Sequence, residues 1–322
     1  MRLRIGSYEM EIRAGRYLGY TPAYNSACFK DFSPPKFYNE LGEKLDPIFI
    51  SDANRAHDPY VPSRYIYFDR YNWGLKTHIY THDLMRKMIG SPDHRYGALT
   101  ESRTIVPEDY KIFEQHKGLS KEFDHIFTFD DRILNNHENA VFAPFCASYW
   151  YGRNNPDNIK DELYKSKSKM ISVMSSDKEL CHLHTVRKEL AIKCKREKIA
   201  DAYGTFDGSA PVNVDDSLKD YRYSIIIEND ETDYFFTEKI TNCFISQTIP
   251  IYLGARRINE FFNEEGIIRI SEKDVDNIDK ILSECTEDAY LGRLEAVLDN
   301  YERVKEYASP WDYIYVRYLI DR

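Results

Sequence analysis

Residues 223–229 read YSIIIEN and residues 248–254 read TIPIYLG. Each is a continuous apolar run, and such runs are typical of strands that are buried on both faces of a parallel sheet. The segment between them, ITNCFISQ (240–247), has the character of a helix. The stretch 223–254 therefore predicts a strand–helix–strand unit, which is a building block of α/β folds.

The same alternation continues on both sides of this unit. MISVMSS (170–176), ADAYGTF (200–206) and GIIRI (266–270) have the pattern of strands. The segment 185–199 predicts a helix, because apolar residues recur there near helical spacing: Val186, Leu190, Ile192 and Ile199. Alternating strands and helices over about 140 residues predict a doubly wound α/β domain.

The chain has 322 residues, whereas single hydrophobic cores tend to stop growing near ~250–300 residues. We expect a first domain over 1–153, a linker over 154–169, a second domain over 170–305 and a C-terminal element over 306–322 that packs back on the first domain. The predicted linker is polar and rich in turn residues. Strand-like runs in the first domain lie at 2–12, 47–51, 64–68 and 125–129.

Charge and composition exclude several classes of protein. The formal net charge of -9 argues against a nucleic-acid partner, which needs a basic face. No run of about 18 apolar residues occurs, so we expect no transmembrane segment and a cytoplasmic protein, with peripheral contact to a membrane left open. The cysteines form no CxxC pair and are expected to be reduced, buried thiols: Cys28, Cys146, Cys181, Cys194, Cys243 and Cys285.

The residues after the strand at 223–229 suggest a site for an anion. Glu228, Asn229 and the loop 230–239 follow the carboxyl end of that strand, where doubly wound domains bind ligands. Thr237 stands where a helix cap belongs, so free backbone N–H groups, the positive helix end and the Lys239 ammonium would converge. The alternative is a surface helix with a solvated lysine. No GxxxxGK[ST] or GxGxxG motif indicates a P-loop or a dinucleotide site.

The whole segment YRYSIIIENDETDYFFTEKITNCFISQTIPIYLGARRINEFF (221–262) resembles the donor-binding signature of the α1,3-fucosyltransferases, glycosyltransferase family 10. The family pattern runs as F-x-x-x-F-E-N, a short loop, Y-V-T-E-K, a helix and T-[VI]-P-[VI]-x-x-G, and the helix has the length found in bacterial members. The resemblance implies a GT-B type α/β fold, in which two Rossmann-like, doubly wound domains face an interdomain cleft. It implies inverting transfer of L-fucose from GDP-fucose to a glycan acceptor, at O3 of N-acetylglucosamine.

The resemblance also implies roles for individual residues. Lys239 and Arg187 would bind the donor diphosphate, while Glu238, Asn229 and Phe235 would bind the ribose and the nucleotide. Residues expected to support the sugar or the cleft are Glu228, Thr237 and Tyr234. Phe235 replaces the usual family tyrosine and Tyr234 a frequent aspartate. Arg187 could instead be a surface residue, since the connection SSDKELCHLH (175–184) is longer than in the family.

GALTESRTI (97–105) resembles the acceptor-side E-S-P segment of the family, and FDHIFTFDD (123–131) resembles the F-D strand that follows it. The resemblance makes Glu101 the general base. Arg103 replaces the family proline, so a solvated loop carboxylate remains the alternative for Glu101.

The resemblance implies that Lys239, Arg187 and the helix end stabilise the leaving nucleotide, so that no divalent metal or other cofactor is required. Two acidic pairs, Asp130–Asp131 and Asp215–Asp216, lack the spacing of a metal-binding DxD motif and are expected in surface loops. His78 and His82 would need a third ligand to bind a metal, so we expect a structural role for them.

Two other functions stay open. One is a GT-B glycosyltransferase that uses another nucleotide sugar. The other is a non-catalytic glycan-binding protein whose tyrosines and tryptophans (Trp73, Trp150 and Trp311) stack on sugars. Residues 13–96 match no family pattern, so the sequence indicates neither the acceptor nor the oligomeric state.

Overall fold

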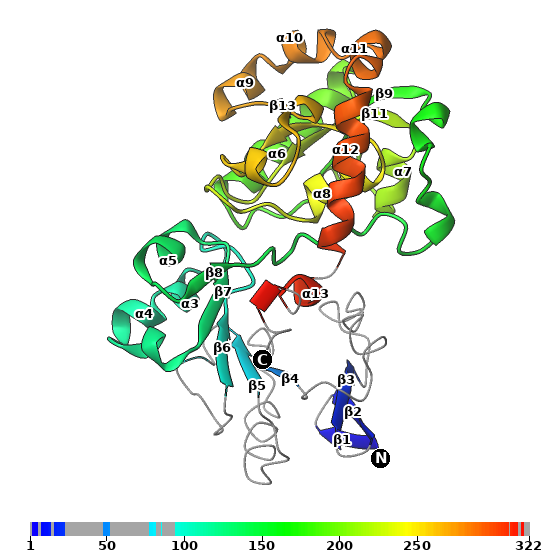
Figure 1. Ribbon diagram of the computed structural model, residues 1–322. Coiled ribbons are helices and arrows are strands. Elements are labelled where there is room, and N and C mark those ends of the chain that lie inside the picture. The colour runs from blue at the N-terminus through cyan, green and yellow to red at the C-terminus, as the bar shows by residue number, and fades with distance from the viewer. Residues whose placement is uncertain are drawn as a thin grey trace. The chain divides into compact units, whose positions relative to one another are not determined.

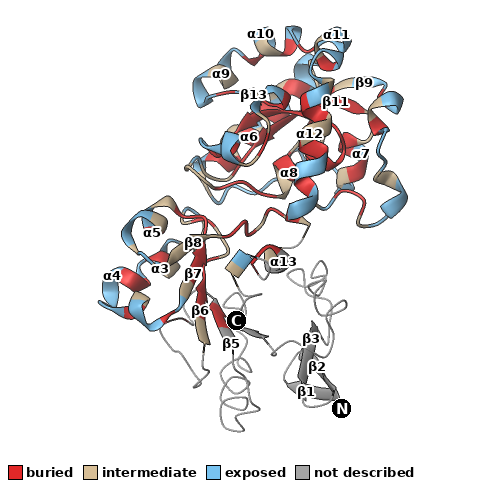
Figure 2. Ribbon diagram, viewed as in Figure 1, coloured by how far each residue is buried: buried red, intermediate tan, exposed pale blue. Residues whose placement is uncertain are grey.

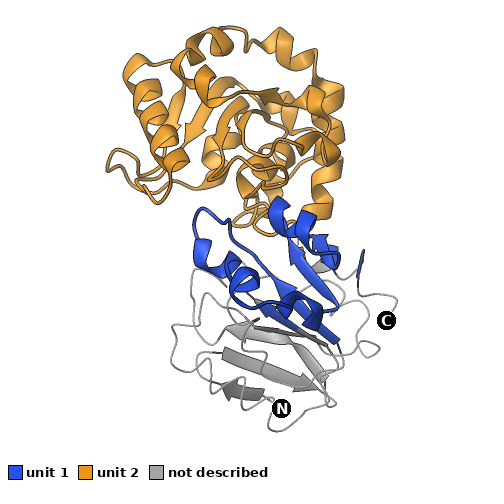
Figure 3. Cartoon of the chain, turned by 90° about the vertical axis from the view of Figure 1, so that its left-hand side faces the viewer, with its two compact units in different colours: residues 1–143, 311–322 blue, residues 144–310 orange. Residues whose placement is uncertain are grey.

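The structure is a computed structural model that describes residues 2–5, 8–13, 16–22, 48–51, 77–81, 85, 94–308, 310–314 and 317–318. The chain divides into two compact units (Figure 3). The first consists of Met1–Ala143 and Trp311–Arg322, and the second of Pro144–Pro310. Each unit has a parallel sheet and helices (Figure 1), which confirms the predicted α/β class.

In the first unit the described strands of the parallel sheet lie side by side in chain order. They are β4 (Ile48–Ser51), β5 (Thr77–Thr81), β6 (His94–Ala98), β7 (His125–Thr128) and β8 (Ala140–Phe142). An antiparallel sheet is formed by β1 (Arg2–Ile5), β2 (Tyr8–Arg13) and β3 (Arg16–Pro22). The run 2–12 is therefore two strands and not one. The predicted strand 64–68 lies outside the described residues.

Short helices and the end of the chain complete the first unit. The helices between β6 and β8 are α3 (Pro107–Tyr110), α4 (Ile112–Gln115), η4 (Leu119–Glu122) and α5 (Asp131–Asn136). After α13 (Pro310–Ile314), the Tyr318 hydroxyl donates to the Phe142 carbonyl at 3.0 Å, and its ring lies against Phe127. The C-terminal residues are thus part of the first unit's packing.

The second unit has a doubly wound parallel sheet with the order β10-β9-β11-β12-β13. Its strands are β9 (Lys169–Met174), β10 (Asp201–Tyr203), β11 (Tyr221–Ile227), β12 (Ile249–Leu253) and β13 (Ile268–Arg269). From β9 the chain moves outward to β10 and then returns to β11 on the other side. The order of the strands therefore reverses between β9 and β11, and such a reversal is where open α/β sheets bind ligands.

Helices cover both faces of this sheet, and every residue of β11 and β12 is buried between them (Figure 2). α6 (His182–Glu197) and α10 (Ile278–Ser283) contribute to the core on one face, while α7 (Val214–Leu218) and α8 (Glu238–Ile245) pack on β11. The remaining α-helices are α9 (Glu272–Asp276), α11 (Glu287–Leu291) and α12 (Leu294–Val304). None of the helices in the described part of the chain is long and apolar enough to cross a bilayer.

The buried face of α6 differs from the apolar face that the sequence predicted. Ile192 is 39% exposed, whereas the polar side chains of His184 and Arg187 are buried beside Leu190. These three residues follow one another at a spacing of three, so they lie on the same side of the helix. The helix therefore turns two nitrogen-bearing side chains towards the end of the sheet.

The cysteines are free where the structure describes them, as expected. Cys194, Cys243 and Cys285 are buried, while Cys146 and Cys181 are only partly buried. The expectation of buried thiols is therefore wrong for those two. Cys28 lies outside the described residues.

The predicted linker 154–169 lies inside the second unit. Gln247, at a positive φ of 54° after α8, holds it: its Nε2 donates to the carbonyls of Lys160 and Asp161 at 2.8 and 3.0 Å. Its Oε1 accepts from the Tyr164 N–H at 2.7 Å. The polar composition of this segment thus reflects bonding to a buried amide.

Lys167, in the same segment, is a fully buried lysine. Its Nζ donates to the carbonyls of Leu218 and Tyr221 at 3.1 and 2.7 Å and to Thr248 Oγ1 at 2.9 Å. These acceptors are uncharged, so they replace water without supplying a counter-charge. Burial lowers the pKa of Lys167 to about 7, which makes the charge of this group costly at neutral pH.

We expect the free energy of unfolding to rise with pH between about pH 7 and pH 10, by up to ~1.4 kcal/mol per pH unit. In this window the unfolded lysine, whose usual pKa is 10.5, holds more protons than the folded one. Below pH 7 both states are protonated, so the contribution becomes constant. Lys167→Met should remove the slope in urea unfolding, whereas Lys165→Met, at an exposed lysine, should keep it. An unchanged slope in Lys167→Met would contradict the assignment.

Candidate functional site

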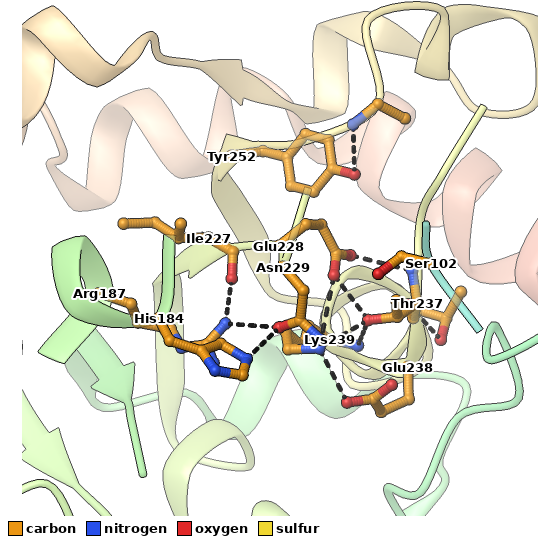
Figure 4. A network of polar contacts seen from close by, with 12 residues as sticks. Ser102, His184, Arg187, Ile227, Glu228, Asn229, Thr237, Glu238, Lys239 and Tyr252 are labelled. Carbon is orange, nitrogen blue, oxygen red and sulfur yellow. Dashed lines mark hydrogen bonds and ion pairs between the residues drawn. The ribbon is translucent and has the colours of Figure 1, made fainter. Parts of the chain in front are cut away.

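Polar side chains gather where β9 and β11 end, at the reversal of the strand order. Figure 4 shows residues from α6, from the end of β11 and from the start of α8 in one network of contacts. The structure brings together Arg187, Glu228, Asn229, Thr237, Glu238 and Lys239, which the sequence placed at one site.

Glu228 is the most deeply buried member of this network. Its Oε1 accepts from the Thr237 N–H at 2.9 Å, and its Oε2 accepts from the Thr237 hydroxyl at 2.7 Å. The Lys239 ammonium lies 3.4 Å from Oε2. Burial raises the pKa of Glu228, and the charge of Lys239 offsets part of that rise. The carboxylate thus fixes the start of α8 against the end of β11.

Gly254, the last residue of TIPIYLG, leaves room for this carboxylate. A Cβ at position 254 would lie 2.6 Å from Glu228 Cγ, and it would also collide with the hydroxyl of Tyr252. That hydroxyl is itself held in place, because it accepts from the Ala255 N–H at 2.9 Å. The glycine of the signature is therefore required by close packing.

The backbone N–H groups at the start of α8 already have acceptors. The Thr237 N–H binds Glu228, the Glu238 N–H donates to the Cys146 carbonyl at 2.6 Å, and the Lys239 N–H donates to Thr237 Oγ1 at 3.3 Å. The expectation of free N–H groups at this terminus is wrong for these three. Thr237 is the N-cap as predicted, and capping is what engages the third of them.

Lys239 is held among three oxygens. Its Nζ lies 3.0 Å from Thr237 Oγ1, 3.2 Å from Glu238 Oε1 and 3.4 Å from Glu228 Oε2. The side chain is 22% exposed, so Lys239 is not the solvated surface lysine of the alternative interpretation. Burial lowers the pKa of Lys239, but the two carboxylates raise it by more, and the pKa is above its usual value. The ammonium is therefore charged.

Arg187 reaches the same site from α6. It is 7% exposed, and its Nη1 donates to the Ile227 carbonyl at 2.5 Å and to Asn229 Oδ1 at 3.4 Å. Its Nε and Nη2 have no hydrogen-bond partner among the residues that the structure describes. The positive charge of Arg187 lowers the pKa of Lys239, so both cations act on one region. Arg187 is thus not a surface residue.

Sequence reasoning missed His184, one turn before Arg187. Its Nε2 lies 2.8 Å from Asn229 Oδ1. The helix predicted from the sequence began at residue 185, whereas α6 begins at His182, so the sequence did not place His184 on the same helix face as Arg187.

Phe235, expected near the nucleotide, and Tyr234, expected to support the sugar or the cleft, differ in exposure. Phe235 is 1% exposed, so its ring is enclosed by protein and offers no free face to a ligand. Tyr234 is partly exposed, and its hydroxyl accepts from Arg257 Nη1. Arg256 binds the same loop through Asp233 at 2.8 Å. These two arginines, which the sequence did not single out, hold the loop that follows β11.

Glu101 lies in the first unit, in the loop between β6 and α3. Its Oε1 accepts from the Ser102 N–H at 2.8 Å, and its carbonyl accepts from the Tyr110 hydroxyl. Arg103, at the position of the family proline, forms two hydrogen bonds of 2.9 Å with Asp130 and lies over the Tyr110 ring. The bidentate ion pair between Arg103 and Asp130 therefore holds the loop that carries Glu101.

The expectation that both acidic pairs lie in surface loops is wrong, because Asp130 caps α5 and Asp215 lies in α7. Asp130 is buried and caps α5 through the Ile133 N–H at 2.9 Å. Asp215 is buried and accepts from the Gly152 N–H at 3.0 Å and from Asn158 Nδ2 at 2.6 Å. These carboxylates have structural partners.

Within the described residues, no group of three or more His, Cys, Asp or Glu side chains is placed to hold a metal ion. The side chains of His78 and His82 lie outside the described residues, as do those of Trp73 and Trp311.

Three solved structures similar to this chain are 15% identical to it or less. An α1,3-fucosyltransferase is 15% identical, with 79% of this chain and 82% of that chain covered and a TM-score of 0.45. An α1,3-fucosyltransferase with GDP-fucose is also 15% identical, with coverages of 85% and 92% and a TM-score of 0.45. A trehalose-6-phosphate synthase is 9% identical, with coverages of 83% and 79% and a TM-score of 0.48. At these values the likenesses assign neither donor nor acceptor.

One protein-family model matches part of the chain. No curated protein matches the chain. Residues 164–291 match the model of the C-terminal part of glycosyltransferase family 10 (fucosyltransferase), and this range contains Arg187 and the whole segment 221–262. The resemblance of that segment to the family is thereby confirmed, and the matched range lies within the second unit.

Proposed function

We propose that the chain transfers L-fucose from GDP-fucose to a hydroxyl of a glycan acceptor, at O3 of N-acetylglucosamine, with inversion at the anomeric carbon. One observation supports this most directly: two cations, the buried Arg187 and the partly buried Lys239, lie together at the strand reversal inside the family-matched segment. Anionic ligands of doubly wound domains bind at this position. The choice of fucose rests on the family.

Donor binding would exchange partners inside the network. An ammonium has three N–H donors, and those of Lys239 face Thr237, Glu238 and Glu228. A phosphate oxygen must therefore displace one of them. Glu238 is the more exposed of the two carboxylates, so it is the one to leave. In its new position Glu238 would accept hydrogen bonds from the ribose hydroxyls, while Lys239 and the free nitrogens of Arg187 bind the diphosphate.

The same cations would assist the chemical step. As the bond from the sugar to the diphosphate breaks, negative charge develops on the leaving nucleotide. Fixed positive groups beside that charge lower the barrier, and single preorganised donors are worth ~3–4 kcal/mol in comparable sites. Arg187 and Lys239 would supply the charge that a divalent cation supplies elsewhere, so we propose that no metal is required.

Glu101 would take the proton from the acceptor hydroxyl as the general base. In an inverting transfer this group acts on the side of the sugar opposite to the leaving group. Tyr110 binds the carbonyl of Glu101, and Arg103 ties the following residues to Asp130, which limits the positions open to the Glu101 carboxylate. A fixed position favours proton transfer, because the base must lie within hydrogen-bond reach of the hydroxyl.

Lys239→Ala should weaken GDP binding by about tenfold to a hundredfold, since hydrogen bonds to charged groups are worth ~1.5–3 kcal/mol. Fucose transfer from GDP-fucose should become undetectable. Titration calorimetry with GDP and a transfer assay on N-acetyllactosamine measure the two effects. Lys195→Ala, at an exposed lysine paired with Asp207, is the control and should change neither. An active Lys239→Ala enzyme with unchanged donor affinity would exclude the phosphate role.

Glu101→Gln should bind GDP-fucose as tightly as the unsubstituted chain and yet lose at least ~100-fold in transfer rate, because general bases contribute about that much. The amide keeps the size of the side chain and removes only its basicity. Glu108→Gln is the matched control, since Glu108 is an exposed residue of the same unit. A nearly unchanged transfer rate in Glu101→Gln would show that another group is the base.

A further inference from the structure

His184 has no part in the function proposed above, although it touches the candidate site. We infer that His184 is a positioning residue, which orients Asn229 so that the amide nitrogen of Asn229 donates to an oxygen of the bound nucleoside diphosphate. The inference rests on the proposed function, since it adds a contact to the same donor site. The contact from Leu180 fixes the protonation of His184, and His184 in turn fixes the orientation of the Asn229 amide.

The first step fixes the tautomer of His184. The Leu180 N–H lies 3.2 Å from His184 Nδ1. A backbone N–H can only donate, so Nδ1 is an acceptor and the proton of the neutral ring is on Nε2. His184 is 4% exposed, and burial together with the charge of Arg187 lowers its pKa, which keeps the ring neutral.

The second step fixes the amide of Asn229. Its Oδ1 lies 2.8 Å from His184 Nε2 and 3.4 Å from Arg187 Nη1. Both of these nitrogens carry hydrogen and neither can accept in this arrangement. The atom facing them must therefore be the oxygen, although the two ends of an asparagine amide are often hard to tell apart.

The third step gives the direction of the remaining donor. With Oδ1 facing α6, the Nδ2 of Asn229 is at the other end of the amide group, and it has no hydrogen-bond partner among the described residues. Asn229 is partly exposed and follows the buried Glu228. Arg187 donates to Asn229 Oδ1, and the charge of Arg187 lowers the pKa of Lys239. The Nδ2 donors of Asn229 therefore lie in the region of both cations. Phosphate and hydroxyl oxygens are the ligand atoms that accept hydrogen bonds from such donors.

His184 is not itself placed for proton transfer. Both of its ring nitrogens are engaged, one with Leu180 and the other with Asn229. Acid–base work would require one of them to be free for the substrate. Its effect on a ligand therefore passes through Asn229.

Two substitutions separate the two ends of the imidazole. His184→Gln extends an amide nitrogen to about the position of Nε2, so it keeps the donor to Asn229. His184→Asn reaches only the position of Nδ1, so it keeps the acceptor for Leu180 and loses that donor. We expect GDP affinity, measured by titration calorimetry, to stay within about threefold in His184→Gln and to fall about tenfold in His184→Asn. His182→Asn, at an exposed histidine of the same helix, should change nothing.

Asn229→Asp gives a second measurement that does not depend on how well the His184 variants fold. The aspartate keeps an oxygen for His184 and Arg187 but has no N–H to donate, so GDP affinity should fall at least about tenfold. In the Asn229→Ala background His184→Asn should have no further effect on GDP affinity, because the coupling between the two residues is then lost.

The possible outcomes distinguish this inference from the proposed function. If His184→Gln and His184→Asn weaken GDP binding equally, or if the effects of His184→Asn and Asn229→Ala simply add, the positioning role is overturned while GDP binding stands. Unchanged GDP affinity in Asn229→Asp would overturn the contact from Nδ2. If the unsubstituted chain does not bind GDP, the proposed function fails and this inference fails with it.

Discussion

The buried carboxylate of Glu228 is the constraint on which the arrangement of the second unit's polar residues depends. A carboxylate removed from water needs donors on both oxygens and a nearby positive charge, or its burial becomes prohibitive. Thr237 supplies two donors and Lys239 supplies the charge. Both belong to the start of α8, so the need to satisfy Glu228 fixes that helix end against the end of β11. Position 254 then requires glycine, because a Cβ there would collide with the side chain of Glu228.

The parts of the fold that depend on local sequence could be predicted. The apolar runs predicted β11 and β12, and Thr237 predicted the start of α8. Both predictions were possible because the burial of a strand and the capping of a helix each produce a sequence pattern within a few residues. The segment 154–169 could not be assigned in this way. A polar stretch looks alike whether its partners are water or a distant side chain, and here the partner is Gln247, more than 80 residues away.

In the candidate site, too, contacts between residues far apart in the sequence could not be predicted. The residue types at positions 228, 238 and 239 placed them at one edge of the sheet but left a surface helix with a solvated lysine open, and only the resemblance of the whole segment favoured one site. The enclosure of Phe235 and the engagement of the Glu238 N–H by Cys146 depend on how separate segments pack. His184 escaped notice because a histidine on a helix has many roles, and its contact with Asn229 joins residues 45 positions apart.

The pairing of Lys239 with Glu238 and Glu228 has a consequence for selectivity. Before a ligand arrives, the site already balances its two cations with two carboxylates, and therefore attracts a passing anion less than two bare cations would. A simple phosphate ion that took Lys239 from Glu238 would leave that carboxylate without a partner. A ligand that carries hydroxyl groups beside its phosphates satisfies both residues at once. If the donor binds here as proposed, the internal ion pair would favour ligands that carry hydroxyl groups beside their phosphates over small inorganic anions.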